Sequence, residues 1–210
     1  MKSLCPLVSP FNCLISGPSQ SGKSSFVAKI IREKEYLFSS VPQNIVWFYG
    51  VWQRAYDELG SSVNKWVEGL PDLEDFDATV HNLLIIDDLM SEADSRVTKL
   101  FTKGSHHKNI SLIYLVQNLF HKGKDHRTIS LNAHYLVLFK NPRDLHQVNH
   151  LAKQMYPGNV KFFLDAFKDA TTEPYGYLFV DLKQSTPDEL RVRTHIFQNE
   201  VTEVYIPKKC

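Results

Sequence analysis

The sequence has little cysteine and no long apolar run. Its three cysteines, Cys5, Cys13 and Cys210, form no C-x-x-C pair, so neither a disulfide framework nor a zinc ribbon is indicated and a reducing compartment fits best. No run of about 18 apolar residues is present, and we therefore expect no membrane span. The first ten residues, MKSLCPLVSP, hold one lysine and a short apolar stretch broken by proline, unlike a secretory signal. These absences predict a soluble, intracellular protein that is not secreted and has no membrane partner.

The sequence also has almost no net charge. The formal value is +1, which by itself identifies no partner. Acidic residues outnumber basic ones between positions 51 and 98, and the balance reverses between positions 99 and 127. Such a contrast is compatible with ordinary variation on a folded surface, and equally with a basic face that binds a polyanion.

Apolar runs alternate with helical patterns along the chain, which is typical of an α/β fold with a mainly parallel sheet. Strands are expected over 11–16, 44–49, 83–86, 110–116, 135–139, 177–182 and 190–197, and helices over 22–35, 93–101, 144–156 and 160–170. One or two short helices are expected in the acidic stretch 51–80. No repeat or linker interrupts the 210 residues. We therefore expect a single domain over 1–210, with a core of about 11–197 and a short C-terminal tail.

A glycine-rich segment, GPSQSGKS, follows the first expected strand and precedes the first expected helix. It matches the phosphate-binding pattern G-x-x-x-x-G-K-[ST] at every fixed position. Its backbone N–H groups can form an anion-binding nest at a helix N-terminus, Lys23 can reach the β- and γ-phosphates, and the Ser24 hydroxyl can ligate Mg²⁺. The residues expected to contact the phosphates of ATP are Gly17, Pro18, Ser19, Gln20, Ser21, Gly22, Lys23, Ser24 and Ser25. The alternative is a plain glycine turn, which the strand–loop–helix context disfavours.

Two carboxylates end the third expected strand, in the segment LLIIDDLM. Ligands of parallel sheets bind at the carboxyl ends of the strands. Asp87 is therefore expected to hold Mg²⁺, and Asp88 to orient the attacking water as a catalytic residue. The alternative is that both carboxylates only cap the following helix.

A polar residue, Gln117, ends the next strand, ISLIYLV. A side-chain amide can donate a hydrogen bond to the γ-phosphate and accept one from the attacking water, so Gln117 joins Lys23 and Asp88 as a catalytic candidate. The alternative is a simple strand cap. Three strand ends meeting at one triphosphate would favour hydrolysis over transfer of the phosphoryl group to a metabolite.

The segments GPSQSGKSS, LLIIDDLM and KGSHHKNISLIYLVQNLF resemble the FtsK–HerA superfamily of DNA-pumping ATPases. More narrowly, the chain resembles the genome-packaging ATPases of double-stranded DNA viruses of the poxvirus and Polinton/adintovirus type, over about 11–197. This resemblance implies a three-layer P-loop NTPase with a mainly parallel sheet and an extra strand between the Walker A and Walker B strands. It also implies a homo-oligomeric ring, a hexamer, that uses ATP and Mg²⁺ to drive double-stranded DNA into a capsid, in contact with capsid proteins. Such motors often carry Glu where this chain has Asp88, which weakens the assignment of that residue.

The resemblance further implies an arginine finger supplied by the neighbouring subunit, for which Arg127 and Arg143 are candidates. An ordinary surface role is the alternative for either arginine. Candidate DNA contacts flank the 110–116 strand, and a solvated basic surface is the alternative for them. These residues are Lys103, His107 and Lys108 before the strand and Lys122 and Lys124 after it.

Two other classes of protein share the phosphate motif. A small P-loop kinase would need an arginine-rich lid, and no arginine cluster is present. A nucleotide-switched interaction protein of the GTPase kind would carry N-K-x-D, whereas Asn64-Lys65 is followed by Trp66-Val67. Both remain as alternatives to a DNA motor.

Overall fold

The computed structural model of the protein describes residues 3–87, 89, 95–104, 108–120 and 124–208. Its strands form one sheet in the order β3-β2-β4-β5-β1-β6-β7-β8-β9. The strands are β1 (Asn12–Ser16), β2 (Asn44–Tyr49), β3 (Lys65–Glu68), β4 (Asn82–Asp87), β5 (Ile110–Val116), β6 (Tyr135–Phe139), β7 (Tyr177–Asp181), β8 (Val192–Thr194) and β9 (Glu203–Val204). The α-helices are α1 (Lys23–Arg32), α2 (Lys34–Leu37), α3 (Ser95–Lys99), α5 (Lys124–Leu131), α6 (His146–Met155) and α7 (Val160–Ala170).

The six strands from β3 to β6 are parallel, and the pairs β6–β7, β7–β8 and β8–β9 are antiparallel. β5 lies between β1 and β4. The predicted extra strand between the two motif-bearing strands is therefore confirmed, as is a mainly parallel sheet.

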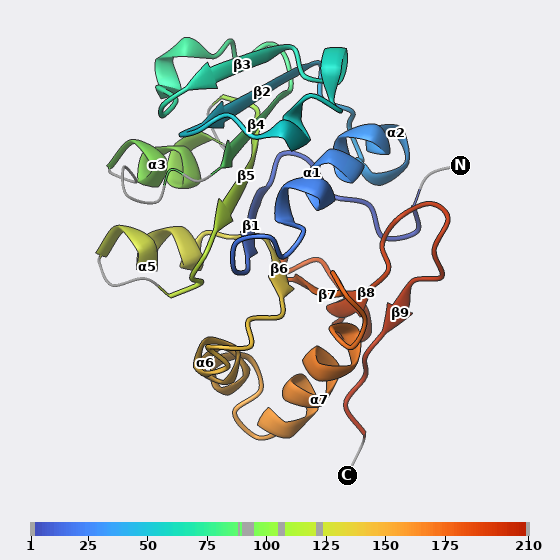
Figure 1. Ribbon diagram of the computed structural model, residues 1–210. Coiled ribbons are helices and arrows are strands. Elements are labelled where there is room, and N and C mark those ends of the chain that lie inside the picture. The colour runs from blue at the N-terminus through green and yellow to red at the C-terminus, as the bar shows by residue number, and fades with distance from the viewer. Residues whose placement is uncertain (1–2, 88, 90–94, 105–107, 121–123, 209–210) are drawn as a thin grey trace.

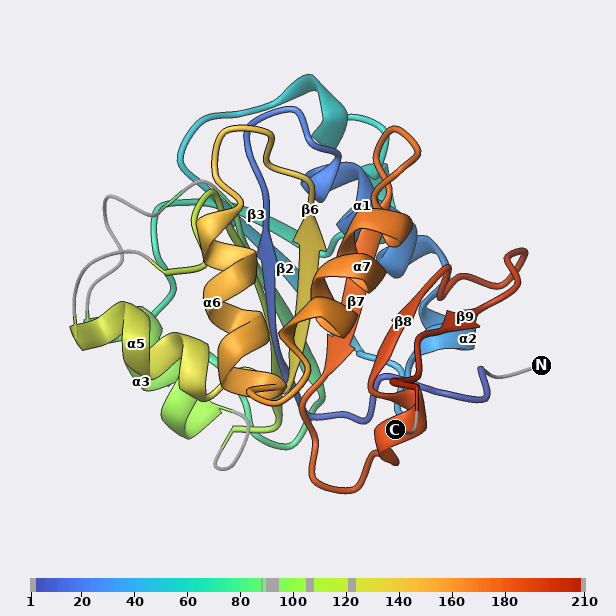
Figure 2. The ribbon, with the colours of Figure 1, turned by 90° about the horizontal axis from the view of Figure 1, so that it is seen from below.

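Helices cover both faces of the sheet, which makes three layers (Figures 1 and 2). Along β4 the side chains alternate between two hydrophobic clusters: Leu84 and Ile86 belong to the cluster that includes residues of α3, α6 and α7, whereas Leu83 and Ile85 belong to the one that includes residues of α1. β4 and β5 are buried along their whole length. Burial on both faces explains why their sequences are continuous apolar runs and do not alternate.

The register of the parallel strands brings three polar positions to one edge. Ser16 pairs with Val116, and Asp87 pairs with Leu115. The residues that follow β1 and β5, Gly17 and Gln117, therefore lie at the same carboxyl edge as Asp87.

Several elements differ from the sequence-based expectation. The strand β3 and the helix α5 were not expected, since KWVE is short and half-polar and KDHRTISL has no strong apolar stripe. The first helix ends at Arg32, and a separate turn of helix starts at Lys34. β8 is shorter than 190–197 because His195 adopts a left-handed backbone, with φ of 53°, which ends the strand. Among the described helices, none is both long enough and apolar enough to cross a bilayer.

Candidate nucleotide-binding site

The glycine-rich loop connects β1 to α1 at the carboxyl edge of the sheet. Gly17 N–H donates to the carbonyl of Val116, at 3.2 Å, which holds the loop against β5. A Cβ at Gly17 would stand 2.7 Å from Phe139 Cβ and from Ser21 Oγ, and Gly22 has a φ of 98°. Both glycines are therefore required locally, the first by close packing and the second by its backbone conformation.

The Lys23 side chain folds back over this loop. Its Nζ donates to the carbonyl oxygens of Gly17 and Pro18, at 2.8 and 2.9 Å. Gln20 also has a left-handed backbone, with φ of 63°. The loop thus places an ammonium group and the first N–H groups of α1 around one concave surface, which is the arrangement that attracts a phosphate.

A buried carboxylate, Asp87, faces the start of α1. Asp87 is 3% exposed, and its Oδ2 accepts hydrogen bonds of 2.8 Å from the hydroxyls of Ser24 and Tyr56. Ser24 Oγ and the Asp87 carboxylate are hard oxygen donors beside a phosphate-binding loop, which are the ligands that Mg²⁺ takes. The residues present therefore fit a magnesium ion held at Ser24 and Asp87.

One cavity of about 800 Å³ joins these groups. Lys23, Ser24, Asp87 and Gln117 all line it, together with Ser19, Gln20, Gly22 and Ser25 of the loop. The three strand ends that the sequence singled out thus converge on one space. Their roles in binding and catalysis remain predictions.

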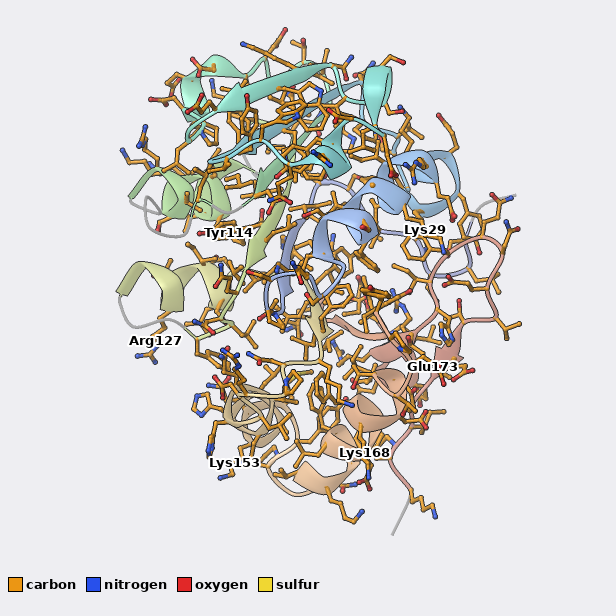
Figure 3. All side chains as sticks on the ribbon, in the orientation of Figure 1. Lys29, Tyr114, Arg127, Lys153, Lys168 and Glu173 are labelled. Atoms are coloured by element: carbon orange, nitrogen blue, oxygen red, sulfur yellow. The ribbon has the colours of Figure 1, made fainter. Side chains whose placement is uncertain are left out.

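The other predicted residues lie elsewhere. Asp88, His107 and Lys122 are outside the described part of the chain, as is the side chain of Lys124. Arg127 lies on α5 (Figure 3), Arg143 lies in the turn after β6, and both are exposed. Neither arginine lines the cavity.

Of the predicted DNA contacts, the structure places Lys103 and Lys108. Lys103 and Lys108 precede β5, at the edge away from the phosphate loop, and Lys108 pairs with Glu74 at 3.3 Å. Lys122 and Lys124 follow Gln117 in the chain. Within the described residues, Lys103 and Lys108 are therefore separated from the phosphate loop by the length of β5.

Some residues in or next to the cavity were missed by the sequence analysis. Tyr56, 31 positions before Asp87 in an acidic stretch, contacts that carboxylate. The stretch holds several aromatic residues, and no sequence pattern distinguishes this tyrosine from the others. Tyr175, Phe197 and Glu200 reach the cavity from the far end of the chain. No local sequence motif predicts contacts between residues so far apart in the chain, so they are seen only in the folded structure.

No protein-family model and no curated protein sequence matches this chain. Two solved structures of the genome packaging NTPase B204 from Sulfolobus turreted icosahedral virus 2 are similar to it, one in complex with ATP-gammaS and one with AMPPCP. Both are 12% identical; they cover 94% and 95% of this chain and 97% and 98% of their own, with TM-scores of 0.51 and 0.52. The fold is that of a P-loop nucleoside triphosphatase.

The ATPase DotB from Legionella pneumophila is a more distant match. It is 14% identical, covers 75% of this chain and 52% of its own length, and has a TM-score of 0.38. The B204 structures therefore carry the fold assignment, because they match nearly the whole of this chain and of their own length.

Proposed function

We propose that this protein is an ATP-hydrolysing motor that translocates double-stranded DNA and packages a viral genome into its capsid. The observation that carries the proposal is the hydrogen bond of 2.8 Å from Ser24 to Asp87, inside a cavity that Lys23 and Gln117 also line. The resemblance to the FtsK–HerA motors supports it. So does the similarity of fold to B204, a genome packaging NTPase whose structures contain ATP analogues.

Each residue has a defined task in this proposal. Lys23 and the loop N–H groups bind the phosphates, and Ser24 and Asp87 hold Mg²⁺, which screens the charge of the triphosphate when bound. Asp88 orients and polarises the attacking water. The Gln117 amide donates to the γ-phosphate and accepts from that water, so it senses whether the phosphate is present.

The partners follow from the same proposal. Subunits assemble as a homo-oligomeric ring, a hexamer by resemblance, in which an exposed Arg127 or Arg143 reaches the site of its neighbour. We favour Lys122 and Lys124 as the residues that bind DNA phosphates, because they follow Gln117 in the chain, whereas Lys108 is already paired with Glu74. The ring would act on assembling virions in the host cytoplasm or nucleus, in contact with capsid proteins.

The test is phosphate release from Mg-ATP, measured with and without duplex DNA and without any phosphate acceptor. We expect release that DNA stimulates, and no release by Lys23→Ala. Sizing with a non-hydrolysable ATP analogue should show a nucleotide-dependent ring. Release only with an added acceptor would instead indicate a kinase, and a monomer that DNA does not affect would contradict the motor.

The proposed contacts with DNA phosphates can be tested separately. A Lys122→Ala/Lys124→Ala double variant should lower DNA-stimulated hydrolysis more than basal hydrolysis, because phosphate contacts hold DNA and not ATP. The control is Lys153→Ala/Lys168→Ala, which removes two exposed cations from α6 and α7 (Figure 3). An equal loss of basal and stimulated rates, or no loss, would argue against these contacts.

A further inference from the structure

The cavity extends well beyond the phosphate loop. Besides the loop, it is lined by Lys29 on α1, by Tyr175 before β7, and by Phe197 and Glu200 after β8. Lys29 lies one helical turn past Ser25 on the same face of α1, about 6 Å along the helix axis. A ligand whose phosphates are held at the start of α1 would therefore reach this second half of the cavity with its other end.

Tyr175 forms the rim of this second half. Its side chain is 71% exposed, and its ring lies against the phosphate loop, because a Cβ at Gly22 would stand 3.1 Å from Tyr175 Cδ1. Its backbone has a φ of 63°, and the next residue must be glycine, since a Cβ at Gly176 would stand 2.5 Å from the Ala170 carbonyl oxygen. A tight turn thus presents an exposed aromatic ring at a fixed place, and left-handed non-glycine residues concentrate at ligand clamps.

The same cavity is also lined by a charged pair, Lys29 and Glu200, beside the aromatic ring of Phe197. Lys29 Nζ lies 2.6 Å from Glu200 Oε1 and 4.1 Å from the centre of the Phe197 ring. Gln198 N–H donates to Glu33 Oε2, at 2.8 Å, so the segment after β8 is tied to the end of α1. Figure 3 labels Lys29 on the side of α1 that faces this C-terminal segment. The pair therefore offers an ammonium donor and a carboxylate acceptor, side by side and already ordered.

We propose that this half of the cavity is a nucleoside subsite, in which Tyr175 stacks on the nucleobase and the Lys29–Glu200 pair meets its polar edge. The subsite rests on the proposed binding of ATP at the phosphate loop. A cavity of about 800 Å³ falls within the size range of small-molecule sites. An aromatic ring and a donor–acceptor pair that line one cavity suit a ligand with a flat heteroaromatic ring, and a bare phosphate chain has no such ring.

The test compares two magnesium-bound probes, ATP and inorganic tripolyphosphate, whose dissociation constants are measured by calorimetry. Wild-type protein should bind ATP more tightly than tripolyphosphate. Tyr175→Ala should raise the dissociation constant for ATP about tenfold, the lower part of the range for base–aromatic stacking, and should leave that for tripolyphosphate unchanged. Tyr175→Phe, which keeps the ring, should retain wild-type affinity for both probes.

The outcomes separate the subsite from the underlying function. Wild-type protein that binds neither probe, or a Lys23→Ala variant that binds both normally, would overturn the phosphate site itself. ATP affinity that Tyr175→Ala does not change would overturn only the subsite. Equal weakening of both probes would also overturn it, because the tyrosine would then act by shaping the phosphate loop. Thermal unfolding of each variant checks that the fold is retained.

Discussion

At the scale of single residues, Tyr56 orients the carboxylate that the proposed metal site requires. The tyrosine is 1% exposed, and its hydroxyl shares Asp87 Oδ2 with the hydroxyl of Ser24. A buried carboxylate is costly unless its oxygens accept hydrogen bonds. The two hydroxyls therefore fix one oxygen of Asp87 at the edge of the phosphate loop.

Substitution of Tyr56 by Phe should affect both stability and the response to magnesium. Loss of a hydrogen bond to a charged acceptor should lower the free energy of unfolding by about 2 kcal/mol, measured by urea denaturation. The Mg²⁺ concentration that half-saturates ATP hydrolysis should rise severalfold, because Asp87 is held less firmly. An unchanged magnesium response would mean that Tyr56 serves stability alone.

Tyr49→Phe is the matched control for this substitution. Tyr49 belongs to the same aromatic group, with its ring 6.1 Å from that of Tyr56, and its hydroxyl makes no hydrogen bond within the part of the chain that the structure describes. We expect it to change the free energy of unfolding by less than about 0.5 kcal/mol and to leave the magnesium response unchanged.

The residues with a local pattern were predictable from the sequence, and their long-range partners were not. Lys23 and Ser24 belong to the glycine-rich motif after β1, Asp87 ends β4 and Gln117 follows β5. Their convergence could therefore be inferred from the rule that parallel strands end at one edge. Tyr56 has no such position. Its contact with Asp87 depends on how the irregular stretch between β2 and β3 folds back over the sheet.

At the scale of elements, Gln147 joins the segment that follows β5 to helix α6. Its Oε1 accepts from the backbone N–H groups of Leu119 and Phe120, and its Nε2 donates to Asn118 Oδ1 at 3.1 Å and to Asp144 Oδ2 at 2.6 Å. The hydrogen bond from Gln147 is also the main cause that lowers the pKa of the Asp144 carboxyl. The chain directly after Gln117 is thus anchored on α6 by one side chain.

Replacement of Gln147 by Ala should therefore disturb the position of the chain between Gln117 and α5 more than that of the phosphate site. We expect the ratio of DNA-stimulated to basal ATP hydrolysis to fall, with basal hydrolysis retained, because the proposed DNA-contacting lysines follow this anchor. Loss of these part-buried hydrogen bonds to backbone N–H groups should also lower the free energy of unfolding, by about 1–3 kcal/mol.

The control for this variant is Gln154→Ala, two turns further along α6. Gln154 is exposed, and its hydrogen bond goes to His150 of the same helix. It should leave stability and the DNA response close to wild type. If Gln147→Ala lowers basal and stimulated hydrolysis by the same factor, the anchor does not act on the DNA response.

Elements were predictable where their pattern was strong. β2, β5, β6 and α7 have the bounds that their apolar runs or helical periodicity indicate. β3 was missed because an edge strand of four residues buries little apolar surface, and α5 because its polar sequence carries no clear helical stripe. Of the antiparallel strands, β7 and β8 were expected from their apolar runs and β9 was not. Their place beside β6 depends on pairing between distant segments, which the sequence pattern does not specify.

At the scale of the whole molecule, the two edges of the sheet have different surroundings. The phosphate loop, Asp87 and Gln117 share the carboxyl edge, whereas Lys103 and Lys108 lie before β5, about 23 Å away along a strand of seven residues. A DNA duplex gripped at the carboxyl edge would be close to the site of hydrolysis. Contact through Lys103 and Lys108 would require coupling across the full depth of the sheet.

Neither Arg127 nor Arg143 lines the cavity, so an arginine from this pair could assist hydrolysis only in the site of another subunit. Arg127→Ala should then lower the rate of ATP hydrolysis about a thousandfold without weakening ATP binding. A mixture of Arg127→Ala and Lys23→Ala subunits, each inactive alone, should regain activity, because the intact arginine of one subunit completes the intact phosphate loop of the other.

Mixing Arg127→Ala with the double variant Lys23→Ala/Arg127→Ala removes every donor arginine at that position and should restore nothing. The same series made with Arg143 distinguishes the two candidates, since only the residue that crosses the subunit boundary supports recovery. Hydrolysis rates measured across mixing ratios should peak at intermediate compositions. If neither series recovers activity, then neither Arg127 nor Arg143 is supplied to the site of a neighbouring subunit. That result would also contradict a ring in which these two arginines couple neighbouring sites.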